Sequence, residues 1–101
     1  MREANVYQVG VLAGVLRELT GTSYEFTYVP GYTGVPISLT LPVRKEAYRF
    51  KAFPPFFEGL LPEGYQLEAM LKKSKLDAKD YFGQLLRVGA DVVGSITVLP
   101  R

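Results

Sequence analysis

The feature that most constrains this chain is a strict alternation of aromatic and polar residues at positions 24–28. Tyr24, Phe26 and Tyr28 alternate with Glu25 and Thr27. A period of two places the three rings on one face of a β-strand, because successive strand side chains point to opposite faces. We expect this aromatic face to pack into the core through cross-strand contacts. A platform on which nucleic-acid bases stack is the alternative interpretation.

The first half of the chain contains further strand-like segments. From Ala4 to Leu19 the sequence is rich in apolar and β-branched residues, and we expect two antiparallel strands joined by a tight turn at Gly10. Glycine there can adopt the positive φ that hairpin turns require. We also expect a short strand at 37–41, at a sheet edge because Pro36 and Pro42 flank it, and an extended segment at 47–53.

The second half is predicted to be mostly helical. A helical turn is expected at 56–61, and Pro62-Glu63 is expected to open a second helix, because proline is tolerated at a first helical position. A third helix is predicted to begin with Asp77 as its N-cap and to end at Gly89. The 92–99 segment is predicted to be the last strand. The expected apolar stripes of the two longer helices are Leu67, Met70 and Leu71, and Tyr81, Phe82, Leu85 and Leu86.

The order of these elements predicts one α+β domain covering residues 1–101. Strands come first, helices follow, and one strand returns to the sheet, which is segregation rather than βαβ alternation. We expect a small, curled, mostly antiparallel sheet of five or six strands with two or three helices packed on it. Its 101 residues are enough for one modest core.

Composition argues against most enzyme chemistry. The chain has no cysteine and no histidine, so disulfides, zinc–thiolate sites and a histidine general base are impossible. Glu58, Glu63 and Asp91 are isolated carboxylates without a nucleophile or metal cluster beside them. We therefore expect no catalytic residue, metal or cofactor, and a cytoplasmic protein. The net charge of +2 gives no strong footprint for nucleic acid, and no apolar run is long enough for a membrane span.

One segment is a candidate for contact with another protein. Prolines and glycines surround the run from Phe56 to Tyr65, and such a loop presents an aromatic side chain with little entropy to lose on binding. Tyr65 is interpreted either as an exposed anchor for a partner, as part of the domain's own core, or as ordinary surface. The predicted partner-binding residues are Phe57, Glu58, Glu63, Gly64, Tyr65 and Gln66.

Four stretches in this order and spacing resemble the N-terminal subdomain of the HipA family of serine/threonine kinase toxins. They are 6–14, 36–42, 53–64 and 80–95; the most specific features are the Phe-rich run that ends in Leu-Leu-Pro-Glu-Gly and the later Gly-x-Asp-x-x-Gly turn. The family often has tryptophan after Leu-Leu-Pro-Glu-Gly, where this chain has Tyr65. Tyrosine keeps a large ring with a polar tip but buries less area.

HipA-type toxins continue into a kinase core, whereas this sequence lacks the phosphate-cradling loop and the His-Arg-Asp and Asp-Phe-Gly elements of phosphoryl transfer. The chain resembles the HipS antitoxins of three-part HipBST systems. This resemblance implies a non-enzymatic antitoxin that docks on the N-lobe of a separate HipT-like kinase, with a helix-turn-helix HipB-like protein in the same complex. A structural or activating kinase subdomain supplied in trans is the alternative.

Overall fold

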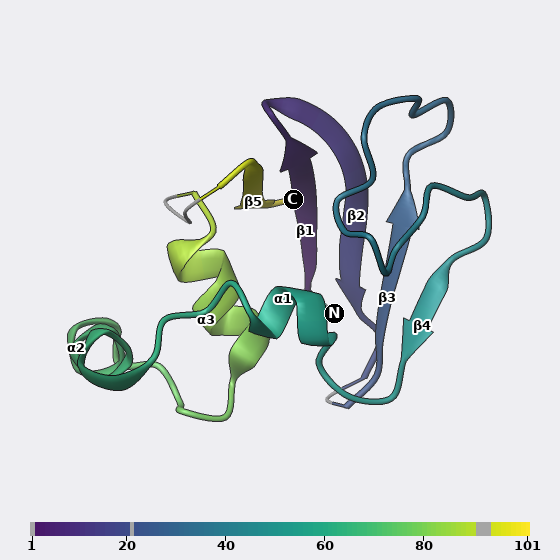
Figure 1. The fold of residues 1–101 in the computed structure, drawn as a ribbon. Coiled ribbons are helices and arrows are strands. Elements are labelled where there is room, and N and C mark those ends of the chain that lie inside the picture. Colours follow the sequence, from purple (N-terminus) through teal and green to yellow (C-terminus); the bar gives the residue numbers. More distant parts are fainter. Residues whose placement is uncertain (1, 21, 91–93) are drawn as a thin grey trace.

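The part of the chain that the structure describes forms a five-stranded antiparallel sheet and three helices, two of which lie on one face of the sheet (Figure 1). The computed structural model describes residues 2–20, 22–90 and 94–101. Within them the strand order is β4-β3-β2-β1-β5, and every neighbouring pair is antiparallel. The predicted α+β class and antiparallel sheet are therefore confirmed. The elements are β1 (Glu3–Gln8), β2 (Val11–Glu18), β3 (Tyr24–Tyr28), β4 (Tyr48–Phe50), α1 (Pro55–Glu58), α2 (Gly64–Ser74), α3 (Tyr81–Val88) and β5 (Ile96–Pro100).

The predicted hairpin turn connects β1 and β2. Val9 and Gly10 both have positive φ, 48° and 77°, as a two-residue turn between twisted strands requires. The pairing passes from Val6 with Gly14 to Tyr7 with Leu12, so one extra residue of β2 forms a β-bulge. A bulge increases local twist, and β2 is accordingly strongly curved (Figure 1).

The core lies between the sheet and the helices α1 and α3. All three rings of the 24–28 alternation are buried, which confirms that face as core. Phe26 lies 5.8 Å from Phe57 of α1, and Tyr24 stacks 6.3 Å from Phe82 of α3, measured between ring centroids. The aromatic face of β3 therefore fixes both helices on the same side of the sheet.

The opposite face of the sheet carries a row of ion pairs. Glu3 on β1 contacts Arg101 and Arg17, and Glu25 on β3 contacts Arg17 and Arg49, at 3.0–3.6 Å. These pairs connect all five strands from the end of β5 to β4. Because alternating charges cover this face, no helix is needed to bury it.

The prediction of a strand at 37–41 is wrong. Only an isolated bridge joins Ser38 and Leu41, and Leu39 between them is 99% exposed. Proline flanks the segment on both sides, and the Tyr28 hydroxyl contacts its two ends, accepting from the Ile37 N–H and donating to the Leu41 carbonyl. These bonds to a side chain replace strand pairing. The extended segment predicted at 47–53 is confirmed over the three residues of β4.

Three helix details differ from expectation. α2 begins at Gly64 rather than at Pro62, because Glu63 is extended, with φ −130° and ψ 164°. Asp80, not Asp77, caps α3, and it accepts a hydrogen bond from the Gly83 N–H at 3.1 Å. In the stripe predicted for α3, Phe82 and Leu85 are buried, but Leu86 is half-buried and Tyr81 is 39% exposed.

The helix α3 ends at Gly89 as expected, but glycine is needed there for close packing against β5 and not for a positive φ. Gly89 has an ordinary right-handed conformation, and a Cβ on it would lie 2.3 Å from the Val98 carbonyl oxygen. The Val98 N–H also donates to the Gly89 carbonyl at 2.9 Å. The last strand is observed at Ile96–Pro100, and positions 91–93, including Asp91, lie outside the described residues.

Candidate partner-binding surface

The segment that leads to the candidate surface is anchored by Phe57. Pro54 and Pro55 start α1, whose four residues are closed by hydrogen bonds from the Glu58 and Gly59 N–H groups to the two proline carbonyls, both 3.0 Å. Phe57 is fully buried between Phe26 and Phe56. Its inclusion among the partner-binding residues is therefore corrected, because a completely buried ring offers no surface to a partner.

Tyr65 projects from the start of α2. Glu63 is extended and Gly64 has φ 59°, so the chain reverses direction immediately before the helix. Glycine is suited to this position because residues with a Cβ rarely adopt positive φ. Tyr65 follows and is 90% exposed, which excludes burial in this domain's own core. The other candidate residues, Glu58, Glu63, Gly64 and Gln66, are also exposed.

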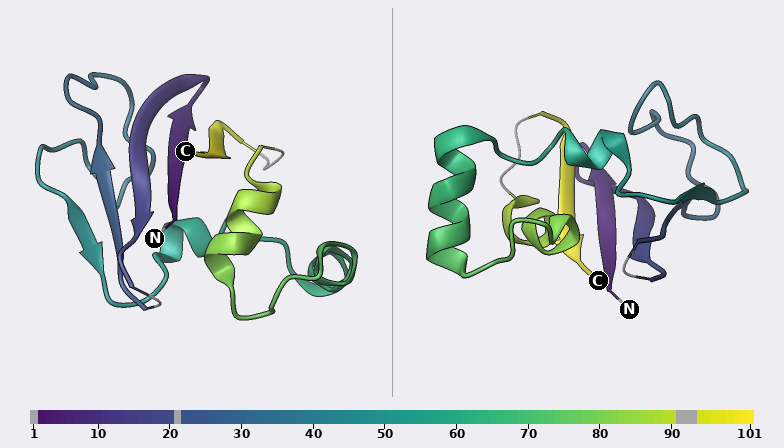
Figure 2. Two further views of the ribbon diagram at one scale, coloured as in Figure 1. Left: turned by 180° about the vertical axis from the view of Figure 1, so that it is seen from behind. Right: turned by 90° about the horizontal axis from the view of Figure 1, so that it is seen from below.

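The helix α2 has no buried residue, although its sequence is amphipathic. Its predicted stripe, Leu67, Met70 and Leu71, is only half-buried. Leu60 and Leu61 just before the helix pack against the core, whereas no residue of α2 does so. Figures 1 and 2 show α2 standing to the side of α3, away from the sheet. The apolar stripe of α2 is thus incompletely covered by its own domain.

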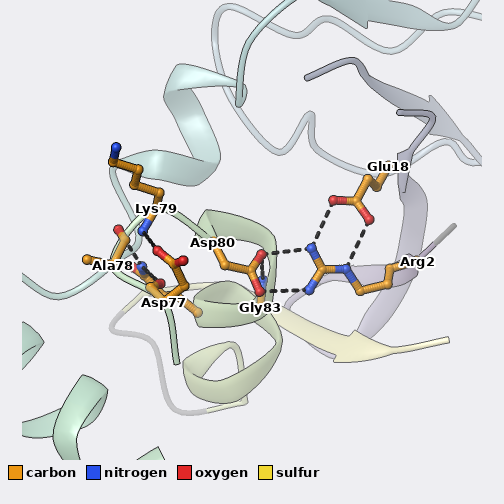
Figure 3. A network of polar contacts seen from close by, with 8 residues as sticks. Arg2, Glu18, Asp77, Ala78, Lys79, Asp80 and Gly83 are labelled. Atoms are coloured by element: carbon orange, nitrogen blue, oxygen red, sulfur yellow. Dashed lines mark hydrogen bonds and ion pairs between the residues drawn. The ribbon is translucent and has the colours of Figure 1, made fainter. Parts of the chain in front are cut away.

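A cluster of charged side chains holds the N-terminus of α3 against the sheet (Figure 3). Arg2, just before β1, donates two hydrogen bonds to Glu18 (3.0 and 2.9 Å) and two to Asp80 (3.0 and 2.7 Å). Its guanidinium also lies 5.2 Å from the Phe82 ring centroid. We call this group the Arg2 clamp. It joins the edge of the β1–β2 hairpin to the N-terminus of α3.

The electrostatics of the Arg2 clamp follow from these bonds. Hydrogen bonds from Arg2 lower the pKa values of both Glu18 and Asp80, and the two carboxylates raise the pKa of Arg2. All three groups therefore stay charged at neutral pH. Asp80 also satisfies an N–H group at the start of α3, so one carboxylate serves both the clamp and the helix cap.

Gln84 of α3 hydrogen-bonds to the turn between α2 and α3. This side chain is buried, and its amide nitrogen donates to the carbonyls of Asp77 and Ala78 at 3.2 and 3.0 Å. Asp77 instead accepts from the Lys79 N–H within the turn, at 2.7 Å. Neither the Arg2 clamp nor the bonds of Gln84 were predicted from the sequence. The available signal for Gln84 was its position: it is a polar residue among the apolar residues of the stripe predicted for α3.

In residues 2–20, 22–90 and 94–101, no group of three or more His, Asp, Glu or Cys could hold a metal ion. None of the helices in this part of the chain is long and apolar enough to cross a bilayer. The region does present an exposed aromatic ring, neighbouring acids and a helix face that is only half-buried.

These features define a small α+β domain with a projecting helix, α2, that has no fully buried residue. The chain belongs to the HipA N-terminal domain family, whose sequence profile matches residues 4–99. A solved structure of the N-terminal domain of HipA toxin has the same fold, with a TM-score of 0.78 and 28% sequence identity. That match covers 100% of this chain and 93% of the other. The resemblance inferred from the sequence is confirmed.

Two relatives differ in how much of their length this domain occupies. An "Uncharacterized protein" of Haemophilus influenzae is 30% identical over 98 residues, covering 97% of this chain and 92% of that protein. The "Putative kinase Y4mE" of Sinorhizobium fredii is 32% identical over 81 residues, covering 80% of this chain but only 19% of that protein. The domain thus makes up nearly all of one relative and a small part of the other.

Proposed function

We propose that this chain is a non-enzymatic, cytoplasmic antitoxin that binds and inhibits a separate HipT-like serine/threonine kinase. The observation that carries the proposal is Tyr65, 90% exposed at the start of a helix whose apolar stripe its own domain covers only in part. Family membership supplies the partner class, since this domain occurs in HipA toxins. The Haemophilus relative, which consists of little more than this domain, supports a protein that acts through the domain alone.

The inhibitory contact is proposed to be the N-terminal end of α2. Glu63, Gly64 and Tyr65 would dock at the kinase N-lobe, where Tyr65 would obstruct the active-site cleft or hold the lobes in an inactive arrangement. Glu58 and Gln66 would contact the rim. The proline-rich turn and buried Phe57 hold this segment before binding, so little conformational entropy is lost when it docks. A HipB-like helix-turn-helix protein would supply any DNA binding of the complex.

The test is kinase autophosphorylation with a HipT-like kinase whose own chain lacks this domain. Wild-type chain should abolish activity at saturation. Tyr65→Ala should weaken inhibition by about thirtyfold, because truncating an aromatic hot spot costs about 2 kcal/mol or more. Tyr65→Trp should inhibit at least as well as wild type, since a larger ring buries more area. The matched control is Leu39→Ala, another exposed apolar residue, which should not alter inhibition.

The outcomes separate the proposal from its alternative. Unchanged kinase activity at saturating chain would refute the antitoxin function. A rise in activity would instead support a kinase subdomain supplied in trans, which the presence of this domain within the Sinorhizobium protein favours. Inhibition that Tyr65→Ala leaves intact would keep the antitoxin function but remove Tyr65 from its mechanism.

A further inference from the structure

A second surface lies at the β3–β4 side of the molecule, away from α2 (Figures 1 and 2). A cavity of about 540 Å³ opens between the end of β3, the following turn and the 43–45 segment. Its lining includes the apolar side chains of Tyr32 and Val43 and two exposed cationic residues, Arg44 and Lys45, which we call its rim. Its size is within the range of ordinary ligand sites, roughly 300–1,000 Å³.

The cavity exists because β4 covers only part of β3. β4 pairs with Tyr24, Glu25 and Phe26, and the chain preceding β4 bends away from the rest of β3 (Figure 1). The Val29 N–H donates to Ala13 on the β2 side. Because successive strand residues direct their main-chain groups to opposite edges, the Tyr28 N–H and C=O point to the β4 side.

The pairing of β3 with β4 ends at Phe26, so β4 supplies no partner for these two Tyr28 groups. Within the described parts of the chain, none of the main-chain hydrogen bonds formed outside the paired strands involves the Tyr28 N–H or carbonyl either. Tyr28 is only 4% exposed, and it lines the cavity. Buried main-chain donors and acceptors are rarely left unpaired. The cavity therefore offers one donor and one acceptor in the geometry of a strand edge.

The rim of the cavity is positively charged and preorganised. Arg44 stacks on the Tyr48 ring at 3.6 Å and donates to the carbonyls of Glu46 and Ala47 at 3.1 and 3.0 Å. Neither Arg44 nor Lys45 forms an ion pair with a carboxylate of the described chain, Glu46 included. Arg44 is thus held in place with guanidinium N–H groups still available to an acid.

We propose that this cavity binds a short, extended, acidic segment of a partner protein. The segment would pair its main chain with the N–H and C=O of Tyr28, insert an apolar side chain between Tyr32 and Val43, and place a carboxylate on Arg44 and Lys45. This is strand addition with a side-chain pocket. A nucleic-acid ligand fits less well, because one face of the Tyr32 ring already stacks on Tyr28 at 5.6 Å. The proposal does not depend on kinase inhibition.

To test this, a random peptide library is selected for binding to the immobilised wild-type chain. Peptides that also bind the Arg44→Glu, Lys45→Glu double variant are removed by counter-selection. Enriched peptides should combine carboxylates with a large apolar residue. In an amide-resolved NMR titration, the best synthetic peptide should shift the signals of Tyr28, Tyr32 and Val43. The double variant should bind it at least about tenfold more weakly, as expected when an acid loses its charged partners.

Two further variants keep the test decisive. Lys72→Glu, Lys73→Glu makes the same charge change on α2 and should bind the peptide like wild type. Val43→Trp fills the cavity without changing charge and should also abolish binding, which decides the matter if the double variant is unfolded. The proposal is overturned by absence of enrichment, by enriched peptides without acids, by shifts confined to α2, or by a short oligothymidylate that shifts the same amides.

Discussion

Replacing Arg2 tests whether the Arg2 clamp contributes to stability. Arg2→Met keeps a long apolar stem and removes four hydrogen bonds to Glu18 and Asp80. The Arg2 side chain is 39% exposed, so each bidentate pair should contribute no more than about 0.5–1 kcal/mol. The contact with Phe82 adds about 0.5 kcal/mol. We therefore expect the free energy of unfolding to fall by about 2 kcal/mol, a large fraction for a domain of this size.

Urea unfolding across pH provides the assay. The folded-state pKa values of Glu18 and Asp80 are lowered, so the stability they contribute is present above their unfolded pKa, about 4, and is lost as pH falls through the folded values. The difference between wild type and Arg2→Met should thus be full at pH 7 and shrink below about pH 4. The control Arg49→Met removes an exposed arginine with one 3.6 Å ion pair and should cost under about 0.5 kcal/mol.

A double-mutant cycle separates the clamp from the helix cap. Asp80→Asn removes the charge but keeps an oxygen that can accept from the Gly83 N–H, since asparagine is also a good N-cap. Arg2→Met and Asp80→Asn should show a coupling energy of about 1 kcal/mol. The reasoning is refuted if Arg2→Met behaves like Arg49→Met, or if its effect is the same at pH 7 and at low pH.

Three further predictions concern the fold. Phe57→Ala should lower the free energy of unfolding by about 3–5 kcal/mol in urea titrations, because it empties a fully buried site. Gly14→Ala should cost about 1–3 kcal/mol, since its Cβ would lie 2.5 Å from the Thr27 carbonyl oxygen and 2.6 Å from the Phe26 ring; a neutral Tm would contradict this. In hydrogen-exchange mass spectrometry, α2 should exchange faster than the sheet, and equal protection would show that its stripe is covered.

Much of the sheet could be predicted because its signals are local. The alternation at 24–28 fixes which face of β3 is buried, and the turn at Gly10 needs only neighbouring residues. The strand predicted at 37–41 does not form, because the Tyr28 side chain, and not a neighbouring strand, bonds the main chain of this segment. The predicted N-cap was wrong for a similar reason. Asp77 and Asp80 are both suitable caps in sequence, but Asp80 is the one bonded to Arg2, a residue 78 positions away that local sequence does not bring into view.

The candidate surface could be predicted only in part. Proline and glycine spacing located the 56–65 segment. Its residues are exposed apart from five: Phe56, Phe57, Leu60, Leu61 and Pro62. Periodicity showed that α2 has an apolar stripe, but not whether its own domain or a partner covers that stripe. The cavity beside β3 could not be foreseen, because it depends on where β4 stops pairing.

The residues that we propose to bind partners lie outside the core that stabilises the fold. The core depends on Phe26, Phe57 and Phe82, none of which a partner can reach. Tyr65 and Arg44 lie outside that core, so we expect substitutions there to change binding rather than folding. In Tyr65 variants, inhibition should therefore vary while the unfolding midpoint stays constant. In Phe57 variants the two should fall together, since the buried ring holds the segment that presents Tyr65.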